Sequence, residues 1–229
     1  NQDELSRHHC SSNTLLMQFC TRIGSSGRYS MSLNRLSALA RHVPFCVLSE
    51  LVRNSDNSLP RENVRNGAVL FIDIGGFTAL SQALPIHLLS HHINAYFSRL
   101  IDEIHLRGGQ VVKFAGDALF AVWFDDPDGE ANSGPIESVA AAVWCGSKIV
   151  GTLNDYRIEG PTGPLSLGVK GACGYGAIRC LHVGTEERAQ FFISGDASRQ
   201  ATKAESYASV GDLRVSPDCL RMLRSAGLL

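Results

Sequence analysis

The sequence predicts an α+β fold with a ferredoxin-like β-α-β-β-α-β core, a mostly antiparallel sheet and helices on one face. Three observations support this prediction. The apolar run 68–73 lies between glycines, which is typical of a buried strand. Apolar residues recur at helical spacing over 79–106 and again over 136–153. Between those stretches, two strand-like runs flank Ala115-Gly116-Asp117, which indicates a hairpin.

The N-terminal part differs in composition from the rest. Residues 1–30 are rich in Ser, Asn, Arg and His and have little periodicity, so we expect a mobile or loosely packed segment. Residues 31–66 are expected to be a lead-in, with helical pieces interrupted near Pro44 and a linker over 54–66. The compact domain is expected over 67–229.

Within that domain the elements are justified in chain order by their apolar patterns and turn residues. One long helix over 79–106 follows the first strand and ends at Gly108. The hairpin strands are expected over 110–114 and 118–124, before the helix 136–153. Four further strands are expected over 165–173, 178–183, 190–193 and 213–215, with a helix over 197–207 before the last of them.

Composition excludes some classes of function. The 229 residues carry 21 Lys+Arg and 22 Asp+Glu, so the charge gives no general reason to expect nucleic acid or an anionic membrane as partner. No run approaches the roughly 18 apolar residues that span a bilayer, and the N-terminus lacks the order of a signal peptide. Seven scattered cysteines without a C-x-x-C pair fit reduced thiols. We therefore expect a cytoplasmic protein without a membrane span, and a first residue other than Met suggests a segment of a longer polypeptide.

Two carboxylates are placed where chemistry could occur. Asp73 ends the first strand and precedes Ile74-Gly75-Gly76-Phe77-Thr78, which opens a helix, and Asp117 lies at the tip of the hairpin. Strand-end carboxylates beside glycine-rich backbone could hold Mg²⁺ while backbone amides bind phosphate oxygens, and a triphosphate with two metal ions would fit. The alternative is structural: Asp73 would cap the helix and Asp117 would be a turn residue.

The same residues also carry a family resemblance. Phe71-Ile-Asp-Ile-Gly-Gly-Phe-Thr78 and Lys113-Phe-Ala-Gly-Asp-Ala-Leu119 resemble the two metal-binding segments of class III nucleotidyl cyclase catalytic domains. The likeness is to the first catalytic domain of the soluble, bicarbonate-responsive adenylyl cyclases. It extends from about Ala38 to the Ser216-Pro217 segment, and residues 1–30 are not covered.

The resemblance implies an activity and a site. The reaction would convert ATP to cyclic AMP and pyrophosphate by in-line attack of the 3′-OH, assisted by two Mg²⁺ (or Mn²⁺) ions. Asp73 and Asp117 would hold the ions with the Ile74 carbonyl. Lys170 would contact the triphosphate, unless it is a solvated strand lysine. The backbone amides that would contact the phosphates belong to Gly75, Gly76, Phe77 and Thr78.

The resemblance also implies an incomplete site. Family members work as paired domains, and the complementary half supplies an Asn and, four residues later, an Arg. Here those positions are Arg199 and Lys203, and Phe192 replaces a polar residue that reads the base. Arg is a planar fork that Lys does not reproduce. We therefore expect a second, non-identical cyclase domain from the same polypeptide.

Pairing of unlike halves leaves a second, degenerate pocket. Lys113 occupies the position of the lysine that contacts the base in the complementary role, so it would face this pocket and contact an anion or a base. Bicarbonate binds there in the soluble adenylyl cyclases, between this lysine and an arginine. The counterpart of that arginine is Thr202, next to Lys203.

Three alternatives remain open from the sequence. The domain could be a guanylyl cyclase, since the complementary half supplies most residues that read the base. It could be a non-catalytic regulatory cyclase homology domain that binds nucleotide or an anion. It could also serve only in pairing. The presence of both Asp73 and Asp117 argues against the regulatory alternative, because loss of a carboxylate would be the simplest sign of decay.

Overall fold

The computed structural model describes residues 38, 40, 42–53, 59–125, 134–160, 163–185 and 188–229. The prediction for residues 1–30 lies outside the described residues. The chain divides into two compact units. The larger contains Glu62–Leu181 and Phe192–Leu229, and the smaller contains the described residues up to Arg61 together with those of His182–Phe191.

The smaller unit includes a helix and a buried group of polar side chains. Helix α3 (Phe45–Arg53) begins directly after Pro44, as expected from the helix-breaking effect of proline. Its Glu50 carboxylate lies 2.6 Å from His182 Nε2 and 3.7 Å from the Arg61 guanidinium. The side chains of Glu50 and His182 are both buried, so a buried polar contact, and not apolar packing alone, joins α3 to its neighbours.

The first strand begins earlier than the sequence predicts. β1 runs over Arg61–Gly75, so the expected domain start at Gly67 falls inside the strand. The residues assigned to a linker are polar, but they pair: the Asn66 carbonyl accepts from the Asp125 amide at 2.9 Å, and Glu62 lies 3.0 Å from Arg179. Burial alternates along this part, as in a strand with one exposed face.

Two helices replace the single long helix expected over 79–106. α4 (Phe77–Ala83) and α5 (Ile86–Leu106) are separated because Leu84 is extended and Pro85 caps α5. A residue before proline is pushed out of the helical region, so the chain turns here. The prediction of one helix was wrong at this point. The hairpin prediction is confirmed by β2 (Gln110–Ala115) and β3 (Ala118–Phe124).

The second long helix, α6 (Pro135–Leu153), is confirmed and has an unexpected composition. By length and composition alone it could cross a membrane, although Glu137 and Lys148 interrupt its apolar residues. Half of its apolar window is buried within the structure. Its residues Val139, Cys145 and Ile149 belong to the hydrophobic core, so in this fold α6 is a core helix.

The remaining elements include two that the sequence analysis missed. β4 (Tyr156–Gly160) and α8 (Pro217–Ser225) were not predicted. β5 (Gly163–Gly184) is one strand where two shorter strands were expected. β6 (Ala189–Ser194), α7 (Asp196–Glu205) and β7 (Leu213–Val215) agree with the predictions to within a few residues.

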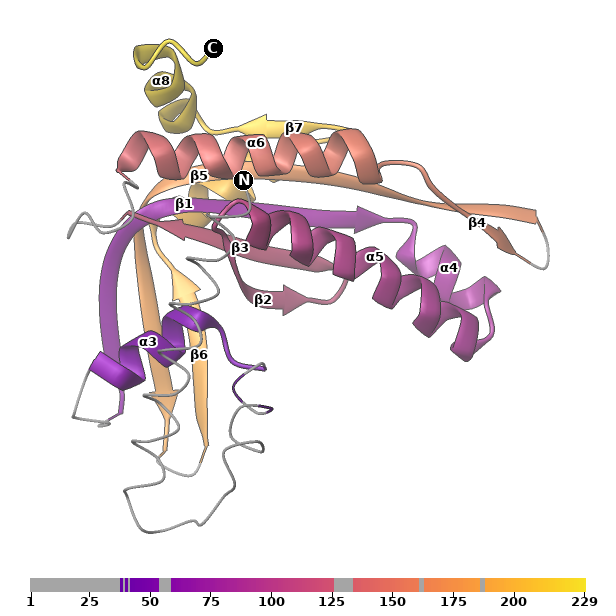
Figure 1. Ribbon diagram of the computed structural model, residues 1–229, viewed down its shortest axis with the longest axis horizontal. Coiled ribbons are helices and arrows are strands. Elements are labelled where there is room, and N and C mark those ends of the chain that lie inside the picture. Colours follow the sequence, from indigo (N-terminus) through magenta and orange to yellow (C-terminus); the bar gives the residue numbers. More distant parts are fainter. Residues whose placement is uncertain are drawn as a thin grey trace. The chain divides into compact units, whose positions relative to one another are not determined.

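The described strands form a seven-stranded sheet in the order β2-β3-β1-β5-β4, with β6 and β7 also pairing with β5. β1 with β3, β2 with β3, and β4 with β5 are antiparallel, while β7 is parallel to β5. Helices α5 and α6 pack on each other and on this sheet, α5 against β2 and α6 against β3 (Figure 1). The α+β prediction with a β-α-β-β-α-β core is therefore confirmed.

The two faces of the central strands have different roles. On β1, Leu70, Ile72 and Ile74 join the hydrophobic core with α5 and α6. Phe71 and Asp73 alternate with them and point to the opposite face, because successive side chains of a strand do so. Phe71 packs there on Phe120 of β3, with ring centroids 4.5 Å apart. This second face carries the polar residues of the candidate site.

Candidate active site

The structure brings the two predicted carboxylates to the same end of neighbouring strands. Asp73 of β1 is paired in register with Ala118 of β3, and Asp117 immediately precedes Ala118. The turn that carries Asp117 is tight because Gly116 adopts φ 67°, a conformation that glycine adopts without steric cost. Residues forty-four positions apart in the chain are thus adjacent, and their juxtaposition follows from the β1–β3 register.

The glycine pair after Asp73 allows a turn and also lets the backbone of β5 come close to the chain. Gly76 has φ 91°, and a Cβ atom there would lie 2.6 Å from the Ser166 carbonyl oxygen of β5. Gly76 is also the N-cap of α4, and no side chain caps this helix. The structural alternative in which Asp73 caps the helix is therefore wrong. The first amides of α4, including those of Phe77 and Thr78, receive no side-chain cap.

Lys170 of β5 lies between two carboxylates. Its Nζ is 2.6 Å from Glu205 Oε1 of α7 and 3.4 Å from Asp73 Oδ2 of β1. The hydrogen bond to Glu205 raises the pKa of Lys170, burial opposes that rise, and the charges of Glu205 and Asp73 add to it. Only 23% of the Lys170 side chain is exposed, so it is not a solvated strand lysine.

Glu205 was not identified from the sequence. It is the last residue of α7, where the helix dipole disfavours a negative charge. Its side chain is only 16% exposed. An acid in the last turn of a predicted helix is a signal that could have drawn attention to it, but its partner Lys170 is thirty-five residues away, and only the tertiary fold joins them.

Lys113 lies on the same face but with a different neighbour. It pairs in register with Phe120, and its Nζ lies 5.5 Å from the ring centroid of Phe192, at cation–π distance. Both Lys113 and Phe192 are exposed. On α7, Arg199 pairs with Asp196 at 2.8 Å, while Thr202 and Lys203 are exposed. Lys113 is thus available to a ligand or a partner.

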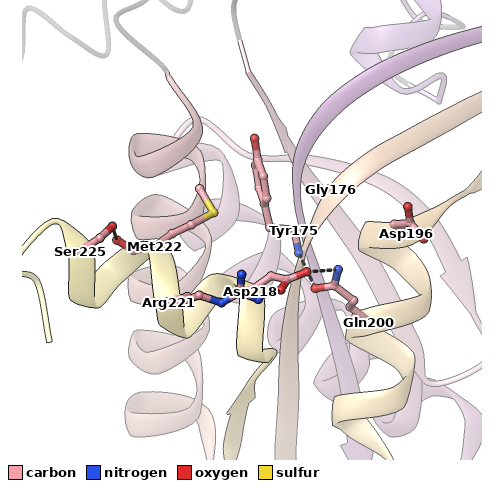
Figure 2. A pocket seen from close by; sticks show the side chains of 8 residues that line it. All are labelled: Tyr175, Gly176, Asp196, Gln200, Asp218, Arg221, Met222 and Ser225. Carbon is pink, nitrogen blue, oxygen red and sulfur yellow. Dashed lines mark hydrogen bonds and ion pairs between the residues drawn. The ribbon is translucent and has the colours of Figure 1, made fainter.

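The larger unit also contains a cavity of about 490 Å³ that none of the predicted site residues lines. Figure 2 shows the Asp218 and Gln200 side chains next to each other, and Gln200 Nε2 donates to Asp218 Oδ2 at 2.8 Å. Asp218 also pairs with Arg221. The Asp218 carboxylate therefore has its partners in neighbouring side chains of the protein. The lining residues are Tyr175, Gly176, Asp196, Gln200, Asp218, Arg221, Met222 and Ser225.

The donor set at Asp73 and Asp117 suits a hard divalent cation. Among the described residues no group of three or more His, Cys, Asp or Glu side chains could hold a metal ion. Asp73 and Asp117 are therefore the only two carboxylates that the proposed pair of motifs contributes within the described part of the chain, and one of them, Asp73, also lies 3.4 Å from Lys170 Nζ. Two carboxylates fit Mg²⁺, which is usually bound by one or two carboxylates while water and substrate phosphates supply the other ligands.

Comparison with known proteins decides the family. The model of the "Adenylate and Guanylate cyclase catalytic domain" family matches residues 59–228, about three quarters of the chain. The chain belongs to this family. The resemblance inferred from the two carboxylate motifs is thus confirmed, and the matched region includes both of them.

Curated relatives of this cyclase domain include adenylate cyclase type 10 of Rattus norvegicus, 27% identical over 208 residues. That alignment covers 86% of this chain and 12% of the relative, so the chain spans about an eighth of its length. A further relative, an adenylate cyclase of Anabaena cylindrica, is 26% identical and is aligned over 81% of this chain and 39% of its own length.

Solved structures support the same fold. A bacterial light-regulated adenylyl cyclase superposes with a TM-score of 0.60 at 21% identity, covering 81% of this chain and 51% of that one. The catalytic core of a rhodopsin-guanylyl cyclase with converted specificity, in complex with ATPalphaS, gives 0.58 at 20% identity and covers 74% and 86%. At these identities the likeness establishes the fold of the cyclase domain.

Proposed function

We propose that this domain is the metal-binding half of an adenylyl cyclase, which converts ATP to cyclic AMP and pyrophosphate when paired with a complementary cyclase domain. The observation that carries the proposal is the register between Asp73 and Ala118, which sets Asp117 beside Asp73 at one end of the sheet. The family match includes both residues. Membership of a fold alone would not locate an active site.

Each residue of this half has a proposed role. Asp73 and Asp117, with the Ile74 carbonyl, hold two Mg²⁺ or Mn²⁺ ions. When bound, these ions would stabilise negative charge on the attacking 3′-oxygen and on the departing pyrophosphate. The backbone amides of Gly75 through Thr78 bind phosphate oxygens at the start of α4. Lys170 adds a positive charge to the phosphates from β5.

The partner follows from what α7 lacks. In the complementary role, positions 199 and 203 would present an Asn and an Arg, but here they are Arg199, paired with Asp196, and Lys203. The chain spans a small part of the curated relatives, which leaves length for a second cyclase domain in the same polypeptide. We propose that this second domain supplies the missing groups and most of the residues that read the base.

ATP is proposed over GTP because several relatives are named adenylate cyclases. A cytoplasmic location is proposed because the seven scattered cysteines fit reduced thiols. Lys113, exposed beside Phe192, is proposed to face the degenerate pocket of the pair, where bicarbonate is a candidate ligand. A guanylyl cyclase and a regulatory domain without catalysis are the outcomes that the experiment below must separate.

The test is cyclic nucleotide formation by the full-length protein with Mg²⁺ or Mn²⁺, using ATP and GTP in parallel. Asp73→Asn and Asp117→Asn should each lower kcat/KM by at least about 100-fold, because even residues that only support metal ligands cost 10–100-fold when changed. Asp102→Asn, which alters an exposed acid on α5, is the matched control and should retain activity.

Each result has a defined meaning. Formation of cyclic AMP that depends on both Asp73 and Asp117 supports the proposal, and cyclic GMP as the main product would replace adenylyl by guanylyl cyclase. Inactivity of the full-length protein with both nucleotides would overturn the enzyme and favour the regulatory alternative. Appreciable activity of the 229-residue chain alone would contradict the half-site.

A further inference from the structure

We propose that Glu205 is a positioning residue that holds Lys170 while a divalent cation occupies Asp73. The inference rests on the proposed function, because it assigns a partner to the lysine of that same site. Glu205 itself would touch neither the cation nor the nucleotide. Its role would be to give the Lys170 ammonium a second, permanent acceptor, so that the lysine can leave Asp73 without leaving the site.

The geometry of the three side chains carries this inference. Lys170 Nζ lies 0.8 Å closer to Glu205 than to Asp73, at 2.6 Å against 3.4 Å. The first distance is that of a short charge-assisted hydrogen bond, and the second is that of an ion pair. All three side chains are largely shielded from water, with exposures of 16% for Glu205, 23% for Lys170 and 28% for Asp73.

The electrostatics require such a second acceptor. Without a metal ion, the Lys170 ammonium neutralises part of the negative charge of Asp73. A divalent cation at Asp73 would stand beside that ammonium, and like charges at a few ångströms repel strongly at a partly shielded site. The shorter bond, from Lys170 to Glu205, already holds the ammonium away from Asp73. A cation at Asp73 therefore has to displace only the 3.4 Å contact between Lys170 and Asp73.

The position of Glu205 is itself informative. An acid at the last residue of α7 opposes the helix dipole, and burial adds a further cost. A charge placed against both effects needs a compensating partner, and Lys170 supplies it. α7 is in turn held against β5 at Gly174, which fixes where Glu205 can reach.

The experiment measures Mn²⁺ alone, without nucleotide, binding to the 229-residue chain by electron paramagnetic resonance. Glu205→Gln should weaken Mn²⁺ binding about 5- to 10-fold, because Lys170 then has Asp73 as its remaining carboxylate. Lys170→Gln should tighten binding by removing the competitor. In the double variant Glu205→Gln/Lys170→Gln the effect of losing Glu205 should vanish, since there is no lysine left to hold.

The double variant separates positioning from simple charge loss. If Glu205 acted only as a nearby negative charge, its removal would weaken Mn²⁺ binding equally with and without Lys170, and that result would overturn the inference. Glu159→Gln, at an exposed acid of β4, is the control for general charge and should bind like the wild type. Glu205→Asp keeps the charge and should restore part of the affinity, which guards against misfolding of a single variant.

Two failures can be told apart. If Asp73→Asn leaves Mn²⁺ binding unchanged, the metal site of the proposed function is wrong, and the inference falls with it. If Asp73→Asn abolishes binding but Glu205→Gln binds like the wild type, the metal site stands and only the role of Glu205 is overturned. In the full-length enzyme, Glu205→Gln should raise KM for the metal–nucleotide complex more than it lowers kcat.

Discussion

Gly174 of β5 and Ala197 of α7 meet backbone to backbone. A Cβ atom built on Gly174 would lie 2.3 Å from the Ala197 carbonyl oxygen and 2.6 Å from the Ala201 amide nitrogen. Ala197 and Ala201 are both fully buried, so small residues on the helix match the missing side chain on the strand. This contact fixes the position of α7 on β5, and α7 is the helix that ends at Glu205.

Gly174→Ala should therefore destabilise the larger unit. Its new methyl group would collide with helix backbone, which cannot move aside as a flexible side chain can, and overpacking of this kind costs about 1–3 kcal/mol. The matched control is Gly151→Ala in α6, where nothing lies within 4 Å of the new Cβ. That variant should gain about 0.5–1 kcal/mol from helix propensity. Urea unfolding measures the stability of both variants. A midpoint of Gly174→Ala equal to that of the wild type would contradict the close contact.

If bicarbonate binds the proposed degenerate pocket and stimulates the full-length enzyme, Lys113→Ala should abolish that stimulation. Lys113 is exposed on the site face, and its ammonium lies over Phe192, so it can supply the positive charge that the degenerate pocket needs for an anion. Lys148→Ala, at an exposed lysine of α6, is the matched control and should keep the response. The measurement is the initial rate against bicarbonate concentration at fixed pH. An unchanged response of Lys113→Ala would show that Lys113 does not belong to the pocket.

Stability should fall at alkaline pH in part through Cys145. Burial, with a smaller contribution from the charge of Glu103, raises the pKa of this thiol to about 12. An unfolded thiol ionises near pH 8.5. Above that pH the unfolded chain loses the proton while the native state keeps it, so the free energy of unfolding decreases until the native thiol ionises. For one thiol the loss between pH 7 and 9.5 is about 1.4 kcal/mol.

Cys145→Ala isolates this contribution from other groups that titrate in the same range. The variant should show a decrease between pH 7 and 9.5 that is smaller than that of the wild type by about 1.4 kcal/mol. Val139→Ala shortens another fully buried side chain of α6 without removing a thiol, so it should keep the wild-type pH dependence. Identical slopes for Cys145→Ala and the wild type would show that Cys145 is not shielded.

Glu50→Ala should loosen the smaller unit locally. The substitution leaves the buried His182 without its 2.6 Å partner and removes the ion pair with Arg61. Breaking a buried pair in this way costs about 3–5 kcal/mol. Amide hydrogen exchange in α3 and in residues 182–185 should accelerate, while Glu159→Ala at an exposed position should leave it unchanged. Unaltered protection would mean that Glu50 contributes nothing to the unit.

The fold was predictable wherever local chemistry decides it. Gly75 ends the first strand, and the hairpin at Gly116-Asp117 needs only two turn residues between two apolar runs. The prediction of one helix over 79–106 failed because the apolar period continues across Pro85. The start of β1 was missed because its first residues are polar and gain their pairing from partners such as Arg179, more than a hundred residues away.

The candidate site divides in the same way. Asp73 and Asp117 stand in recognisable motifs, and the family match includes both. No sequence motif contains Glu205 or indicates that it binds Lys170. Sequence spacing also left open whether Asp73 caps a helix, and the structure excludes this because α4 has no side-chain cap.

By itself the sequence determined the β-α-β-β-α-β order of the core, the family and the two carboxylate motifs, since each depends on residues close together in the chain. Tertiary structure decided which charges meet. The β1–β3 register brings Asp117 beside Asp73, and the seating of α7 on Gly174 of β5 carries Glu205 to Lys170. Charge pairing depends on distances of a few ångströms in space, and those distances are fixed by packing between elements far apart in sequence.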